Sequence, residues 1–154
     1  MNAKPIPDGY SSVTPYLIVH DPAQAIEFYK KAFNASERFR MPGPDGKIGH
    51  AEIEIGGSAI MMGGDCPGRT QSPKTIGGSP VGLYLYVKDV DAIFKQAVDA
   101  GATVTQPVQN WFYGDRSGAL TDPFGHIWHV ATHVEDVPPQ EIAKRAAAAM
   151  AQKK

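Results

Sequence analysis

The chain has 154 residues, of which 42% are hydrophobic and 20% are charged, and its formal net charge at pH 7 is −1. This composition supports one folded domain and argues against disorder and against nucleic-acid binding, which needs a large basic surplus on one face. The only cysteine is Cys66, so neither an intrachain disulfide nor a thiolate zinc cluster can form. No run resembles a signal peptide or a membrane span, and we therefore expect a cytoplasmic protein without a membrane partner.

One motif occurs twice in the chain. Tyr-Leu-x-Val-x-Asp stands at residues 16–21 and again at 84–89. A duplication of this kind predicts a single domain built from two similar modules, which we place at about 12–63 and 81–133. The Gly- and Pro-rich stretch 64–80 between them is expected to be a linker.

Each module is predicted to begin with a strand and an aspartate-capped helix. The first strand covers 13–19 or 81–87, and the helix that follows is capped by Asp21, with Gln24 as capping-box partner, or by Asp89. Asn34 and Gly101 are expected to end the two helices. Three strands follow each helix, at 35–41, 49–55 and 58–62 and at 103–110, 116–121 and 126–132. The predicted fold class is α+β, with two tandem βαβββ modules and a last Ala-rich helix at about 138–150.

Strand alternation assigns the side chains to two faces. The apolar residues are expected to face the helices: Ala51, Ile53, Ile55, Val81, Leu83, Leu85, Val87, Trp128 and Val130. The opposite faces then hold aromatic and ionisable groups: His50, Glu52, Glu54, Tyr84, Tyr86, His129 and His133. Such a mixture is typical of a ligand pocket rather than of a sealed core.

The paired modules, together with Asp122-Pro123-Phe124-Gly125-His126 before the last strand, resemble the vicinal oxygen chelate superfamily. This group includes glyoxalase I, bleomycin- and fosfomycin-resistance proteins and extradiol dioxygenases. The run at 41–47 with His50-Ala51-Glu52 is similar to the PhnB-like branch. The resemblance implies an open eight-stranded cup formed by both modules, a divalent metal in that cup, and a homodimer.

The metal ligands that the resemblance implies fall on four positions, Thr14, Met61, Gly82 and His129. Only His129 is a suitable ligand, since zinc-type ions need imidazole or carboxylate donors, and we expect no metal or other cofactor. A displaced divalent metal could still bind at His50, Glu52 and His129, which are also the candidate catalytic acid and base groups. Alternatively, His50 and Glu52 form a hydrogen-bonded pair.

The segment 111–116 combines aromatic side chains with an Asp-Arg pair and is expected to overhang the cup. Arg116 could clamp an anionic ligand group, or it could pair with Asp115 or lie at a dimer seam. The candidate ligand-binding residues are Thr14, Met61, Tyr84, Tyr86, Trp111, Tyr113 and Arg116. Three functions remain open: a metal-free protein that binds a small oxygen-rich or aromatic molecule, a glyoxalase-type lyase or isomerase that uses His129 with His50 or Glu52, and an interaction module without a ligand.

Overall fold

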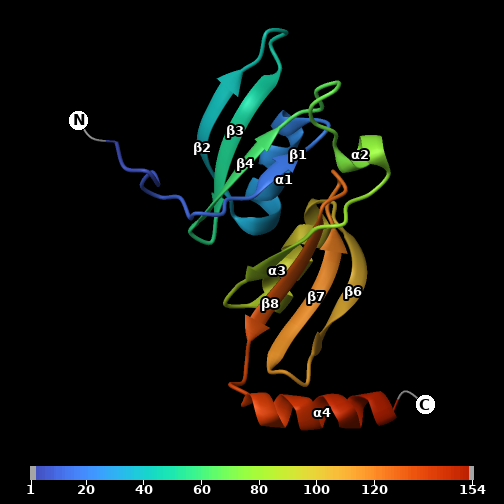
Figure 1. The fold of residues 1–154 in the computed structure, drawn as a ribbon. Coiled ribbons are helices and arrows are strands. Elements are labelled where there is room, and N and C mark those ends of the chain that lie inside the picture. Colours follow the sequence, from blue (N-terminus) through green and yellow to red (C-terminus); the bar gives the residue numbers. More distant parts are fainter. Residues whose placement is uncertain (1–2, 153–154) are drawn as a thin grey trace.

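A computed structural model describes residues 3–152, which form two four-stranded sheets with a helix packed on each (Figure 1). The first unit contains β1 (Tyr16–Ile18), α1 (Pro22–Phe33), β2 (Ser36–Pro42), β3 (Ile48–Ile55) and β4 (Ser58–Gly63). The second contains β5 (Gly82–Tyr86), α3 (Val90–Ala100), β6 (Thr103–Asn110), β7 (Asp115–Thr121) and β8 (Ile127–His133). The order βαβββ therefore occurs twice, and the predicted α+β fold class is confirmed.

The two sheets have the same topology. Their strand orders are β1-β4-β3-β2 and β5-β8-β7-β6, and in each sheet the first strand runs parallel to the last while the other neighbours are antiparallel. The first strand of each sheet is thus one of its two edge strands, and β2 or β6 forms the other edge.

Local signals fix the ends of α1 and α3. The Asp21 carboxylate accepts a hydrogen bond from the Gln24 backbone N–H (3.0 Å), and Asp89 accepts one from the Ala92 N–H (3.0 Å). Asn34 ends α1 in the left-handed conformation, at φ 55°. The Gln24 side chain differs from the capping-box expectation, because its amide donates to the Asp21 carboxylate instead of reaching the backbone N–H.

The stretch 64–80 is folded, and it contains a helical turn that the sequence did not indicate, α2 (Pro73–Ile76). The Asp65 carboxylate accepts hydrogen bonds from the Ser72 N–H (2.6 Å), the Ser72 hydroxyl (2.8 Å) and the Thr75 hydroxyl (2.9 Å). Hydrogen bonds among its own residues therefore stabilise the connection between the modules.

One hydrophobic core is shared by both modules. Helix α1 packs against α3, and the Trp128 ring of β8 lies 4.6 Å from the Phe33 ring and 5.5 Å from the Tyr29 ring of α1 (centroid to centroid). The Tyr29 hydroxyl donates to the buried Asp122 carboxylate across the same contact (2.6 Å). The helix-facing side of each sheet is therefore buried in common, and the other side of each sheet is turned away from this core.

These outward sides carry the candidate site residues, and we call them the first and second open faces. The first belongs to β1–β4 and includes Tyr16, Phe39, His50, Glu52 and Met61. The second belongs to β5–β8 and includes Tyr84, Tyr86, Asp115, His129 and His133. One predicted core residue is wrong: Val81 is 64% exposed, because β5 begins only at the next residue.

The last helix, α4 (Pro139–Ala151), crosses the end of the second sheet (Figure 1). Arg145 of this helix forms ion pairs with Glu135 (2.8 Å) and Glu141 (3.1 Å). Within residues 3–152, no helix has both the length and the apolar character that crossing a membrane requires.

Candidate functional site

A buried carboxylate organises the second open face. Asp115 is only 4% exposed, and its Oδ2 accepts hydrogen bonds from the hydroxyls of Tyr86 (2.8 Å) and Tyr84 (3.3 Å). Its Oδ1 lies 2.8 Å from His133 Nδ1, and the second ring nitrogen of His133 lies 2.9 Å from Asp136 Oδ1. With a carboxylate oxygen at each nitrogen, the His133 ring is placed to donate from both, as the imidazolium does.

These contacts shift the ionisation of the cluster. Burial by itself would raise the pKa of Asp115, but the hydrogen bonds from His133, Tyr86 and Tyr84 outweigh it and hold that pKa below its usual value. The hydrogen bond to Asp115 raises the pKa of His133. Burial raises the pKa of Tyr84 to about 12, and the hydrogen bond to Asp115 raises that of Tyr86. Both phenols therefore stay neutral over the physiological pH range.

Further aromatic rings extend this cluster. The Tyr84 ring stacks on His129, with centroids 5.6 Å apart and planes at 13°, and it lies 5.1 Å from the Tyr86 ring. Trp111 and Tyr113 stack on each other at 6.0 Å and 11°. The Trp111 indole N–H donates to the backbone oxygen of Ser117 (3.3 Å) and so ties the β6–β7 connection to the sheet.

The first open face holds a chain of hydrogen-bonded groups. His50 Nε2 lies 3.1 Å from Glu52 Oε1, and His50 Nδ1 lies 3.2 Å from the Tyr16 hydroxyl. The Tyr10 hydroxyl donates to Glu52 Oε2. Burial would raise the pKa of Glu52, but the hydrogen bonds from Tyr10 and His50 outweigh it and lower that pKa. The expected His50–Glu52 hydrogen bond is present.

The structure does not bring His129 together with His50 and Glu52. His129 stacks on Tyr84 on the second open face, whereas the other two residues lie on the first. Over residues 3–152, His, Cys, Asp and Glu side chains form no group of three or more that could hold a metal ion. The alternative metal site is therefore not assembled by one chain, nor is an acid–base group that spans both modules.

The four positions at which the resemblance implies metal ligands do not fit such an ion. Thr14 donates its hydroxyl to the backbone oxygen of Ser11 (3.1 Å), and Met61 lies on β4 with a thioether as its donor. A Cβ added at Gly82 would lie 3.0 Å from His129 Nε2, so the imidazole fills the space of a side chain there. His129 is the single suitable donor of this set.

The Arg116 side chain lies on the helix side of the second sheet, away from the second open face. On β7 the Asp115 side chain points to the open face, and alternation turns the next residue to the helix side. The Arg116 guanidinium forms two hydrogen bonds with Asp91 of α3 (2.7 and 2.8 Å) and one with Asn110 (3.2 Å). Asp115 pairs with His133 rather than with Arg116.

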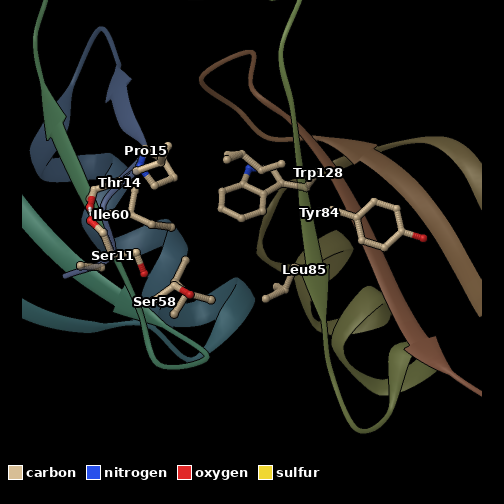
Figure 2. A pocket seen from close by; sticks show the side chains of 12 residues that line it. Ser11, Thr14, Pro15, Ser58, Ile60, Tyr84, Leu85 and Trp128 are labelled. Atoms are coloured by element: carbon tan, nitrogen blue, oxygen red, sulfur yellow. Dashed lines mark hydrogen bonds between the residues drawn. The ribbon is translucent and has the colours of Figure 1, made fainter. Parts of the chain in front are cut away.

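A small cavity lies where the two modules meet. Its volume is about 170 Å³, and its wall is formed by the segment before β1 together with residues of β3, β4, β5 and β8. Figure 2 shows Trp128 and Leu85 directed into this gap, opposite Pro15 and Ile60, whereas the Tyr84 ring points away from it. Thr14 also lines the cavity, which is smaller than the roughly 300–1,000 Å³ of typical small-molecule sites. This small volume argues against the cavity as a site for a drug-sized molecule.

Several residues of the first open face were not identified from the sequence, among them Tyr10, Tyr16 and Arg38. Alternation could have found Tyr16, because Leu17 and Val19 are the buried residues of that run. Tyr10 precedes the first strand and carries no periodic signal. Arg38 lies at a break in the pairing register of β2, between Glu37 and Phe39, which alternation does not anticipate.

Comparison with known proteins gives consistent matches. The family model "Glyoxalase/Bleomycin resistance protein/Dioxygenase superfamily" matches residues 11–130. The protein Mb0911c of Mycobacterium bovis is 45% identical over 135 residues, which are 85% of this chain and 89% of that protein. TioX from Micromonospora sp. ML1 has a similar structure, with a TM-score of 0.63, 28% identity, and coverage of 80% of this chain and 99% of TioX. A PhnB protein from Bacillus cereus shares the fold, with a TM-score of 0.61, 18% identity, and coverage of 79% and 99%.

Proposed function

Because the chain belongs to the glyoxalase/bleomycin resistance protein/dioxygenase superfamily, a fold that supports many unrelated activities, we propose its function from the site itself. The protein binds a small oxygen-rich or aromatic molecule on the second open face, without a bound metal. The observation that carries this proposal is the group of aromatic rings over the buried Asp115 carboxylate. Tyr84 is 48% exposed and Tyr86 is 59% exposed, so both rings offer flat apolar area to a ligand.

The rings are held in place before any ligand arrives. Asp115 fixes the hydroxyls of Tyr84 and Tyr86, and His129 packs flat against the Tyr84 ring. Groups that are already oriented lose little conformational entropy on binding. The tyrosine oxygens can still accept hydrogen bonds, which suits a ligand with hydroxyl or amide donors.

Tryptophan fluorescence offers a direct test, since the chain has two tryptophans and one of them borders this face. Trp128 is buried in the shared core, whereas Trp111 stacks on Tyr113. A panel of small aromatic and polyhydroxylated molecules is titrated against the protein. The hits should quench Trp111, and the signal should disappear in Trp111→Phe.

A matched pair of variants separates this face from the rest of the molecule. Tyr84→Ala should weaken each hit by about tenfold or more, which corresponds to about 1.4 kcal/mol. Arg116→Ala should leave the affinities unchanged, because its guanidinium is held by Asp91 on the helix side. Equal losses in both variants, or none in Tyr84→Ala, would exclude the second open face as the site.

We also propose that the protein is a symmetric homodimer. In this dimer the first open face of each copy lies against the second open face of the other copy. Large apolar side chains are exposed on both faces: Tyr16, Phe39, Met41, Tyr84 and Tyr86. Exposed large apolar side chains that gather on one face are typical of an interaction site. A second copy would cover it and convert the open second face into an enclosed cup.

The dimer is tested by light scattering at micromolar concentration. The wild-type chain should have twice the 16.6 kDa mass of the monomer, and Phe39→Glu should return the mass to 16.6 kDa. Ile76→Glu is the control, because Ile76 is equally exposed but lies on α2, away from both open faces. A monomeric wild-type protein would refute the proposed dimer.

A further inference from the structure

The first open face already holds a phenol, which is the side chain of Tyr10. The Tyr10 hydroxyl donates to Glu52 Oε2, and the Arg38 guanidinium lies over the Tyr10 ring at 4.5 Å from its centroid. A carboxylate that accepts from the hydroxyl and a cation over the ring face are the two interactions that recognise a phenol. The hydrogen bond also raises the pKa of Tyr10, so this phenol stays protonated and remains a donor.

The groups around this phenol are positioned by the sheet and do not depend on Tyr10 for their placement. Glu52 is nearly buried in β3 and is held by His50 Nε2 (3.1 Å). Arg38 stands at the register break between Glu37 and Phe39, where an extra residue in the strand re-aims a side chain. The next arginine along β2, Arg40, instead pairs with Glu37 (2.7 Å). The break therefore separates two arginines with different surroundings.

The segment that carries Tyr10 is held by few contacts. Residues 3–9 are exposed, and the salt bridge of Lys4 with Asp8 (2.7 Å) lies within the segment itself. Its hydrogen bonds to the sheet are the one from Tyr10 to Glu52 and the one from Arg38 to the backbone oxygen of Gly9 (2.9 Å). Tyr10 can therefore leave the face without disturbing the shared core.

We propose that the first open face is a binding site for a small phenol, and that Tyr10 occupies it in this structure as a tethered competitor. A free phenol binds there by replacing the Tyr10 ring beneath Arg38 and by donating its hydroxyl to Glu52. Within one chain, this site is formed by residues other than those of the second open face.

Competition by Tyr10 has a measurable consequence. If the site is free in only a fraction of the molecules, the apparent affinity for an external ligand falls by that fraction. A segment that holds the site in about nine molecules of ten therefore weakens binding about tenfold. Removing the Tyr10 ring should restore that factor.

The test uses 4-methylphenol, which has the shape of the tyrosine side chain, and measures its affinity by calorimetry and by protein-observed NMR. Tyr10→Ala should bind 4-methylphenol about tenfold or more tightly than the wild type, with shift changes at the His50 and Glu52 amides. Adding Arg38→Ala to Tyr10→Ala should abolish this gain, whereas adding Arg40→Ala should not. 4-Methylanisole, which has no hydroxyl to donate, should bind at least tenfold more weakly than 4-methylphenol.

Thermal unfolding is the check that each variant is folded, and we expect Tyr10→Ala to be folded because the segment that carries Tyr10 lies outside the shared core. Three results would overturn the proposal: no gain in affinity in Tyr10→Ala, equal binding of 4-methylanisole, or equal losses from Arg38→Ala and Arg40→Ala. Binding that disappears in Tyr84→Ala instead would assign the phenol to the second open face and likewise exclude this site.

Discussion

Asp115→Asn is the most informative single substitution on the second open face. It keeps the shape of the side chain but removes the negative charge that accepts from Tyr86, Tyr84 and His133. A hydrogen bond to a charged group contributes about 1.5–3 kcal/mol, and one between neutral groups about 0.5–1.5 kcal/mol. The short Tyr86 bond at 2.8 Å carries most of this difference, because the Tyr84 contact is longer at 3.3 Å and His133 is half exposed.

We therefore expect Asp115→Asn to lower the free energy of unfolding by about 1–2 kcal/mol. For a chain of this size that corresponds to a decrease in Tm of about 2–8 °C. Asp136→Asn is the control, because it removes the other carboxylate at His133 from a fully exposed position, and its Tm should stay at the wild-type value.

The pH dependence gives a second, independent readout. The raised pKa of His133 contributes stability that is complete below about pH 6.5, its unfolded value, and is lost as the pH rises through the folded value. The lowered pKa of Asp115 acts at the other end, where its contribution is present above about pH 4 and is lost on further acidification. Asp115→Asn should reduce both the loss of stability at high pH and the loss of stability at low pH. Thermal unfolding between about pH 3 and 9 measures these two losses.

Residue-resolved NMR titration of the tyrosine rings shows which interaction raises the pKa of each tyrosine. The pKa of Tyr86 should fall toward its ordinary value in Asp115→Asn, because the hydrogen bond to Asp115 is the main reason that it is raised. The pKa of Tyr84 should stay near 12, because burial is its main cause. An unchanged Tyr86 titration, together with a wild-type pH profile of stability, would refute the role given to Asp115.

Three further predictions concern the core, one loop and metal content. Tyr29→Phe should lower the free energy of unfolding by about 1.5–3 kcal/mol in chemical denaturation, because it removes the buried hydrogen bond to Asp122 (2.6 Å); a loss below about 0.5 kcal/mol would contradict this. Gly114→Ala should cost about 3 kcal/mol, because φ is 100° and a Cβ would overlap the Glu135 backbone oxygen, whereas Gly57→Ala, with open space around it, should cost about 1 kcal/mol; similar losses in both would be inconsistent with that overlap. Elemental analysis of protein purified without added metal should find much less than one metal ion per chain, and a stoichiometric ion that is lost in His129→Ala would overturn the metal-free assignment.

The sequence was sufficient wherever the determining interactions are local. Asp21 and Asn34 bound α1 through contacts within a few residues, so their residue types alone predicted both ends. Alternation correctly placed Glu52 and Tyr84 on the faces opposite the helices, because a shift of one residue would turn the apolar residues of each strand away from the core. The same rule, counted back from the buried Leu120, would also have turned Arg116 toward α3.

Long-range placement was not predictable in the same way. Alternation assigns His50 and His129 to the outer faces of their own sheets, but it does not say how two sheets are arranged relative to each other. That arrangement follows from the packing of α1 on α3 and from aromatic contacts between residues about a hundred positions apart. The Tyr10–Glu52 contact also joins distant residues, and Arg38 depends on a local break in register. Neither the Tyr10–Glu52 contact nor the position of Arg38 produces a periodic pattern in the sequence from which it could be predicted.

The aromatic contact between the modules also bears on how the chain reaches its folded state. Phe33 and Tyr29 come from the first half and Trp128 from the second, and none of the three rings is more than 5% exposed. Half a chain would leave its share of these rings in water, at about 1.5–3 kcal/mol for each large apolar side chain. Two fragments produced by a cut at the exposed Gly68 should each be mostly unfolded alone and should fold together when mixed. Although the sequence is a duplication, we therefore expect its two halves to fold and unfold as one cooperative unit.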